Sequence, residues 1–213
     1  MKNYIMGFVI ICALVLSGCS FGKSVEKQLS DTLSKMYNAE EVYRDRQAGL
    51  SELEKSEQEL FISAMELTQE ETKELKEKVS KLEEMLNERL SEVKEEEASM
   101  KKAKELTKSL DEAISKVDDI HKKEVEALKN AVANRYELHA TFIAEYKKLA
   151  SIQTDLYEML TNEETNMPEL TSKVDEVNTQ NEIVQSAVHI FNESTETVNR
   201  LKEDMFTSFK KDK

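Results

Sequence analysis

Three histidines are the side chains of this sequence best suited to hold a metal ion. A di-iron site in a helical bundle uses Glu-x-x-His on two helices together with further inward-facing glutamates. His121 follows Asp118 at that spacing, whereas His139 and His189 have no acid there. We therefore assign no metal ligands and no cofactor. His121 and His139 lie on or beside a predicted apolar seam, where we expect core-edge histidines with hydrogen-bonded ring tips.

The sequence gives no more support for nucleophilic or acid–base catalysis than for a metal site. A catalytic serine usually sits on a strained, glycine-rich turn, which this glycine-poor chain lacks. Carboxylates are abundant, as at residues 95–97, but neighbours on a helix point in different directions and indicate a solvated acidic face. We predict no catalytic residues and a protein that is not an enzyme.

Aromatic side chains form the grouping most able to recognise a sugar. Tyr136, Phe142, Tyr146 and Tyr157 recur along one predicted helix. A tyrosine ring can stack on a sugar while its hydroxyl forms a hydrogen bond, so this group is our best candidate for a ligand-facing surface. The alternative is that the rings simply pack inside a bundle. The residues do not identify a ligand.

The amino terminus carries the sharpest motif. Lys2 precedes an apolar run over residues 5–16, which is shorter than the about 20 residues that span a bilayer and is typical of a secretory signal. The run ends in Leu16-Ser17-Gly18-Cys19, which resembles the lipobox of bacterial lipoproteins. By that resemblance the chain is cleaved between Gly18 and Cys19 and carries diacylglycerol on the Cys19 thiol. The alternative is a plain signal peptide with an incidental cysteine.

This motif sets the expected domain organisation and location. Residues 1–18 are the signal peptide, residues 19–22 the lipidated terminus and a short linker, and residues 23–211 a single helical domain. Cys12 lies in the removed part, so Cys19 is the sole remaining thiol and no disulfide forms within a monomer. Durable anchoring needs more than one acyl chain, such as an added palmitate, and places the protein on the extracytoplasmic face of the cell membrane.

The composition requires long helices. Charged residues make up 34% of the 213 residues, against about 25% in ordinary domains. There are only four glycines and one proline, and neither type occurs in residues 50–167. A sheet-rich fold and glycine-rich phosphate loops are therefore excluded. The net charge of -13 argues against nucleic acid as a partner.

Apolar residues recur every seventh position along two regions. One row runs from Val79 to Leu156, and a second runs from Leu170 to Met205. This spacing is typical of coiled-coil packing. A companion to the second row holds Asn181 and Thr195, which we expect to fix the register of the helices.

Helix boundaries follow from caps and breakers. A capping-box pattern begins at Thr68, and a similar pattern at Ser51 follows Gly49, where we expect a kink or restart. Asp118 and Asp119 mark a possible turn, and Pro168 fits the first turn of the last helix.

The predicted fold is all-α: an elongated antiparallel up-and-down bundle with coiled-coil-like packing. We favour four helices of roughly 40 to 50 residues with a turn at Asp118-Asp119, because four helices can enclose an apolar core. The alternative is three helices with one very long central helix over residues 71–160. It remains open because the seven-residue repeat passes through the proposed turn without interruption.

With the lipobox in front of this helical body, the chain resembles the YkyA-type cell-wall-binding lipoproteins of Gram-positive bacteria. The likeness covers essentially the whole length. It is carried by the lipobox, residues 50–55 leading into residues 59–61, Arg135-Tyr136, residues 146–148, Leu156-Tyr157, residues 191–193 and residues 198–199. The resemblance implies an all-helical bundle, a lipid anchor in the membrane and association with the cell wall, and it supplies no catalytic residues.

Two functions follow as hypotheses. In the first, the protein is a non-enzymatic wall-binding protein or a spacer between membrane and wall. The acidic body opposes direct binding to anionic wall polymers, so local lysines, aromatic rings or bridging cations would have to mediate it. In the second, a coiled-coil face docks a membrane or wall-synthesis protein, or a second copy of the chain.

Overall fold

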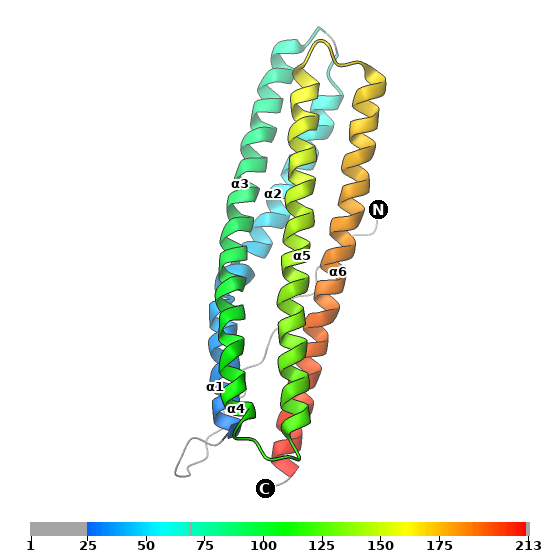
Figure 1. Ribbon diagram of the computed structural model, residues 1–213. Coiled ribbons are helices and arrows are strands. Elements are labelled where there is room, and N and C mark those ends of the chain that lie inside the picture. The colour runs from blue at the N-terminus through cyan, green and yellow to red at the C-terminus, as the bar shows by residue number, and fades with distance from the viewer. Residues whose placement is uncertain (1–24, 69, 212–213) are drawn as a thin grey trace.

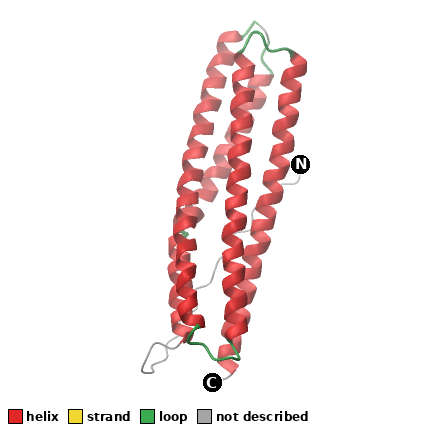
Figure 2. Ribbon diagram, viewed as in Figure 1, coloured by secondary structure: helices red, strands yellow, loops and turns green. Residues whose placement is uncertain are grey.

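Four long helical segments, here called rods, run alternately up and down the length of the molecule. The structure is a computed structural model and describes residues 25–68 and 70–211. The elements are α1 (Val25–Ala39), α2 (Glu41–Met65), α3 (Thr72–Glu105), a 3₁₀ turn η1 (Leu106–Lys108), α4 (Ser109–Ile114), α5 (Lys122–Thr161) and α6 (Met167–Lys211). The described ranges contain no strand (Figure 2), so the all-α prediction is confirmed.

The rods alternate in direction. α1 and α2 form the first rod, α3 through α4 the second, and α5 and α6 the third and fourth (Figure 1). The chain turns between Ile114 and Lys122, so the favoured four-helix bundle is confirmed and the single long central helix is wrong. Asp118 stabilises this turn, because its Oδ1 accepts a hydrogen bond from the His121 backbone N–H at 2.9 Å. The seven-residue repeat continues across the turn because its positions face the core in the helices on both sides, so the repeat does not reveal the turn.

The first rod breaks at Glu40 and continues straight through Gly49, contrary to our expectation. Two side chains bind backbone carbonyls beside the break. Ser99 Oγ of α3 donates to the Ala39 carbonyl at 2.7 Å, and Arg44 Nη1 donates to the Tyr37 carbonyl at 2.6 Å. A helical glycine costs only about 1 kcal/mol relative to alanine, so packing against α3 keeps α2 intact at Gly49. Ser51 therefore lies inside α2 and caps nothing.

Caps define the two turns at the opposite end. Glu71 Oε2 accepts hydrogen bonds from Thr68 N–H and Thr68 Oγ1, both at 2.8 Å, just before α3. At the start of α6, Asn166 N–H donates to Glu169 Oε2 at 3.2 Å while Glu169 N–H donates to Asn166 Oδ1 at 3.0 Å. The second pair is a reciprocal capping box. Pro168 lies in this first turn, as predicted.

Close helix packing follows the order of the chain. The backbone of α2 lies closely along α3, α3 along α5, and α5 along α6. The remaining side, between α6 and the first rod, is bridged by side chains such as Tyr43 and Phe191, whose ring centroids are 5.9 Å apart. No described helix is long and apolar enough to cross a membrane.

Three apolar clusters make up the core, one below the other along the rods. The predicted row from Val79 to Leu156 faces inward, and Val184, Phe191 and Met205 of the second row are buried. Asn181 is exposed, so its predicted role in register is wrong. The preceding residue, Gln180, is buried instead and donates from Nε2 to the Glu145 backbone carbonyl at 3.1 Å and to its Oε2 at 2.7 Å.

Candidate functional site

The predicted lipidation and cleavage residues, Gly18 and Cys19, lie outside the described residues. The first described residue is Val25, at the end of the bundle that also holds the α4–α5 turn and the end of α6 (Figure 1).

The aromatic group on α5 does not face a ligand. Tyr136, Tyr146 and Tyr157 are buried, with 3%, 4% and 2% of their surface exposed, and Phe142 is buried with them. Each tyrosine hydroxyl donates to a glutamate from the first rod: Glu40, Glu54 or Glu57. The rings therefore pack inside the bundle, as in the alternative, and their hydroxyls contribute to layers of buried polar groups.

The first polar layer lies where α1 meets α2. Arg135 Nη1 and Nη2 bind the two carboxylate oxygens of Glu40 at 2.8 and 3.1 Å. Tyr136 Oη donates to the same carboxylate at 2.5 Å, and Arg135 Nε donates to Thr195 Oγ1 at 2.8 Å. The guanidinium also lies 5.0 Å from the centroid of the Phe191 ring. One buried cation thereby joins the first rod, α5 and α6, and Thr195, one of the two residues expected to fix the register, contributes to this layer.

The second layer contains a buried histidine–carboxylate pair. Glu96 is fully buried, and its Oε1 lies 2.7 Å from His139 Nε2. Gln47 Nε2 donates to the other Glu96 oxygen at 2.8 Å. Burial raises the pKa of the Glu96 carboxyl, and the bond and charge of His139 oppose that rise. The His139 ring packs among three aromatic rings, those of Tyr43, Phe142 and Phe191. The pair is buried, with aromatic rings around the imidazole.

The third layer centres on Arg89. Its Nε lies 2.7 Å from Glu57 Oε2, and its Nη2 donates to Glu57 Oε1 at 3.0 Å. Its Nη1 donates to Tyr146 Oη at 2.8 Å, and Nη2 also binds Gln153 Oε1 at 2.8 Å. Tyr157 Oη completes the layer through Glu57 at 2.5 Å. Burial raises the pKa values of the Tyr146 and Tyr157 hydroxyls, which keeps both as hydrogen-bond donors.

Sequence reasoning missed these layers, although a signal for them exists. Glu40, Gln47 and Glu54 recur every seven residues on the first rod, and Arg89 and Glu96 do so on α3. Charged residues are ordinarily assigned to the solvated face, yet Glu40, Arg89 and Glu96 are buried, while Glu54 at the edge of the third layer is exposed. Each buried charged group lies beside a partner, so a solute reaches it only if helices separate. This arrangement suits a structural role.

The other histidines are placed separately. His121 is buried, with Nδ1 2.8 Å from Asp118 Oδ1, and its ring stacks on Phe209 at 4.3 Å between centroids. Its backbone and side-chain hydrogen bonds to Asp118 lower the pKa of that carboxyl. His189 is exposed beside Glu193. Among residues 25–68 and 70–211, no three histidine, cysteine or acidic side chains gather in a way that could hold a metal ion.

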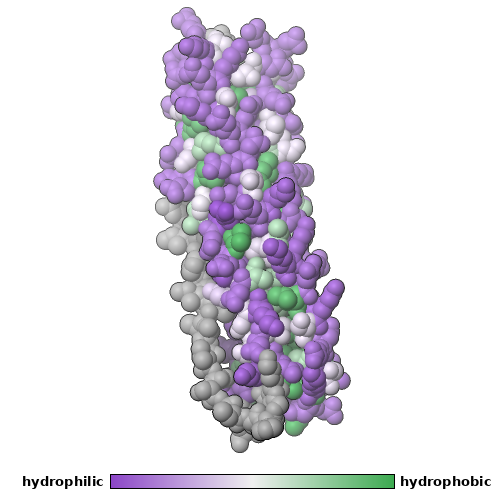
Figure 3. Space-filling model, turned by 90° about the vertical axis from the view of Figure 1, so that its left-hand side faces the viewer, coloured by the Kyte–Doolittle hydropathy of each residue, from purple (hydrophilic) through white to green (hydrophobic). Residues whose placement is uncertain are grey.

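Two shallow hollows lie on the outer surface of the described residues. A hollow of about 530 Å³ at the start of α3 is lined mostly by glutamates and lysines. A groove of about 270 Å³ between α5 and α6 is more apolar and is lined by Leu138, Thr141, Glu145, Ile183, Ser186, Ala187 and Ile190. On the face shown in Figure 3, apolar side chains form small separate patches within a hydrophilic surface.

Known proteins match this chain along nearly its full length. The YkyA family, described as "Putative cell-wall binding lipoprotein", matches residues 24–208. The chain belongs to the YkyA family. The YkyA lipoprotein of Bacillus subtilis (strain 168) is 30% identical over 205 residues, which cover 94% of this chain and 90% of that protein. The predicted family resemblance is thereby confirmed.

The YkyA-family fold also matches a solved structure. A crystal structure of a conserved Staphylococcus aureus protein of unknown function superposes with a TM-score of 0.71 at 19% identity. The match covers 88% of this chain and 98% of that one. At this level of identity the match bears on the fold alone, and it agrees with the helical bundle.

Proposed function

We propose that this protein is a lipid-anchored, non-enzymatic spacer on the extracytoplasmic face of the membrane, with its far end directed into the cell wall. The observation that carries the proposal is the rod itself. α6 has 45 residues and is about 68 Å long at 1.5 Å per residue, and the first described residue lies at one end of that length. A chain tethered at one end of such a rod presents its other end far from the bilayer.

The tether is supported by the lipobox at residues 16–19 and by the lipoprotein description of the family. Cys19→Ala in the full chain tests it. We expect the variant to leave the membrane fraction, because the acyl chains are the proposed attachment. Continued membrane retention of the variant would argue against lipid anchoring through Cys19.

Wall association is supported by the family description, while the net charge of -13 opposes it for anionic polymers. The test is co-sedimentation of residues 20–213 with purified sacculi, with and without teichoic acids and across a salt series. We expect this fragment to be a stable helical monomer or weak dimer without enzymatic turnover. Saturable pelleting supports direct binding. Dependence on teichoic acid identifies the polymer that is bound, and dependence on salt shows how much of the binding is electrostatic.

A lack of pelleting would favour the second candidate, an interaction module for a membrane or wall-synthesis protein. The observation behind it is the α5–α6 groove, where Ile183 and Ile190 are 42% and 45% exposed one heptad apart. Residues seven apart on one helix face are the usual contacts of a docked helix. Crosslinking from Ile183 in intact cells would capture such a partner.

A further inference from the structure

The two ends of the bundle differ in charge. We define the anchor end as residues 25–28, 115–124 and 207–211, and the far end as residues 62–73 and 160–169. The anchor end has six lysines and four carboxylates, whereas the far end has one lysine and six carboxylates. Since the whole chain has a net charge of -13, the anchor end is a local exception to its acidic character. The six lysines are Lys27, Lys116, Lys122, Lys123, Lys210 and Lys211.

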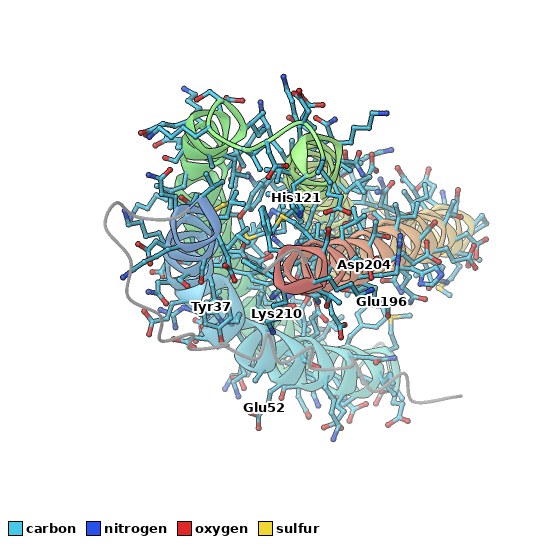
Figure 4. All side chains as sticks on the ribbon, turned by 90° about the horizontal axis from the view of Figure 1, so that it is seen from below. Tyr37, Glu52, His121, Glu196, Asp204 and Lys210 are labelled. Carbon is cyan, nitrogen blue, oxygen red and sulfur yellow. The ribbon has the colours of Figure 1, made fainter. Side chains whose placement is uncertain are left out.

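An isoleucine projects from the anchor end. Ile120 is 76% exposed, the largest value among the exposed large apolar residues that the structure describes. The turn that carries it is fixed on both sides, because His121 binds Asp118 and stacks on Phe209 near the end of α6. Seen from this end, His121 and Lys210 lie on neighbouring rods (Figure 4). Ile120 is therefore presented on an ordered turn, directly after Asp118 and Asp119, with Lys116 before them and Lys122 and Lys123 after His121.

The tether decides which end meets the bilayer. Only residues 20–24 separate Cys19 from α1, and a chain of that length reaches at most about 20 Å. The start of α1 is at the anchor end (Figure 1), so that end must stay within this distance of the membrane. The far end lies about 68 Å away along the rod when the bundle stands upright. The exposed large apolar residues of the far end, Ile62, Met65 and Met167, are then out of reach.

We propose that the anchor end is a second membrane contact, in which Ile120 enters the headgroup region and the surrounding lysines face anionic lipid phosphates. This inference rests on the proposed lipid anchor. A single apolar side chain and a small basic cluster bind a membrane weakly by themselves, but the anchor holds them at the surface. The contact orients the rod upright, because the acidic sides are repelled by the same anionic surface.

Fluorescence quenching tests the proposal on the full lipidated chain. Ile120→Cys supplies the sole free thiol, because Cys19 is acylated, and it takes an environment-sensitive NBD probe. The protein is reconstituted in phosphatidylcholine vesicles with and without 30% phosphatidylglycerol, using lipids with shallow doxyl quenchers. We expect a blue shift and a loss of roughly half the emission, as for a probe about 5–10 Å into the headgroup boundary. The loss should be greater with phosphatidylglycerol and should shrink as salt is raised.

Met167→Cys and Ile183→Cys are the matched controls, at the far end and on the side of the rod, and we expect neither probe to be quenched. An unquenched probe at position 120, or quenching at 167 or 183 that equals it, would overturn the proposal. Failure of the lipid anchor gives a different result, because the labelled protein would then not float with the vesicles at all. Flotation without quenching at position 120 refutes the anchor-end contact alone.

Discussion

α2 and α6 are the two outer helices beside the central pair of α3 and α5, and they are held by different means. α6 buries Val184, Phe191 and Met205 in apolar clusters and lies closely along α5. The buried residues of α2 are Leu50, Glu57 and Ala64, and much of its side-chain hydrogen bonding runs through glutamates, which bind Arg89 of α3 and Tyr146 of α5.

This difference separates two properties of the bundle. Apolar packing contributes stability in proportion to the area removed from water, with little dependence on pH or salt. A buried ion pair contributes less net stability but is costly to break, so it penalises every register that leaves a charge unpaired. We infer that α6 supplies mainly stability and that the polar layers fix how the first rod aligns with α3 and α5.

The largest effect is expected at the centre of the third polar layer. Arg89→Ala leaves the Glu57 carboxylate buried without its cation, which should lower the free energy of unfolding by about 3–5 kcal/mol. Urea denaturation followed by circular dichroism measures the change. Replacing both partners, with Arg89→Met and Glu57→Leu, should recover most of the loss. A single variant that loses under about 1 kcal/mol would contradict a structural role for this layer.

Loss of apolar packing at α6 should be slightly less costly and insensitive to pH. Met205 is fully buried, so Met205→Ala should cost about 2–4 kcal/mol through lost burial and a residual cavity. The exposed Met167 provides the control, since Met167→Ala should stay within about 0.5 kcal/mol of wild type. If the Met205 effect changed strongly between pH 5 and pH 8, the contrast between α6 and α2 would fail.

Glu96 should give the second layer a distinctive pH dependence. Burial raises its folded pKa above the ordinary 4.5, so the folded chain keeps a proton that the unfolded chain releases. The stabilisation is complete below pH 4.5 and is lost as the pH rises through the folded pKa. The difference in unfolding free energy between wild type and Glu96→Gln should therefore fall with rising pH, by about 1.4 kcal/mol per unit of pKa difference.

Glu97 offers a control of opposite sign for that measurement. The side-chain hydrogen bond from Lys147 is the main cause that lowers the pKa of Glu97. The stabilisation from Glu97 is present above its unfolded pKa and is lost as the pH falls through the folded pKa. The difference in unfolding free energy between wild type and Glu97→Gln should therefore rise with rising pH. Urea titrations from pH 3 to pH 8 compare the two variants. Parallel slopes would show that burial of Glu96 is not what shifts its titration.

The smallest effect is expected at the register residue of α6. Gln180→Ala removes two hydrogen bonds to Glu145 and should cost about 1 kcal/mol. Asn181→Ala changes an exposed neighbour and should stay within about 0.5 kcal/mol of wild type. Thermal unfolding of the two variants side by side makes the comparison. Equal losses would restore Asn181 as a register determinant.

The fold was predictable because its main signals are local. Long heptad rows, the lack of glycine and proline, and the caps at Thr68 and Asp118 are all read over short stretches of chain. The break at Glu40 could not be found in this way. It depends on Ser99, which lies 60 residues from Ala39 in sequence.

The interior of the bundle was predicted less well, for the same physical reason. Tyrosines such as Tyr136, Tyr146 and Tyr157 are typical of a sugar-binding surface. Only their hydrogen-bond partners show that they lie inside the bundle. Those partners, Glu40, Glu54 and Glu57, are 92 to 100 residues away along the chain. Local patterns assign charged residues to solvent, and only the three-dimensional register shows that these carboxylates accept hydrogen bonds from the tyrosine hydroxyls.

The seven-residue spacing of Glu40, Gln47 and Glu54 limits how the length of this rod can evolve. An insertion in one helix would displace its part of a layer from the arginine or histidine opposite it. A lengthened or shortened descendant that keeps its layers paired must change all four rods together, by seven residues each, which is about 10 Å of length. The bundle lengths of relatives should therefore differ in steps of seven residues, made in all four rods together, rather than by single residues.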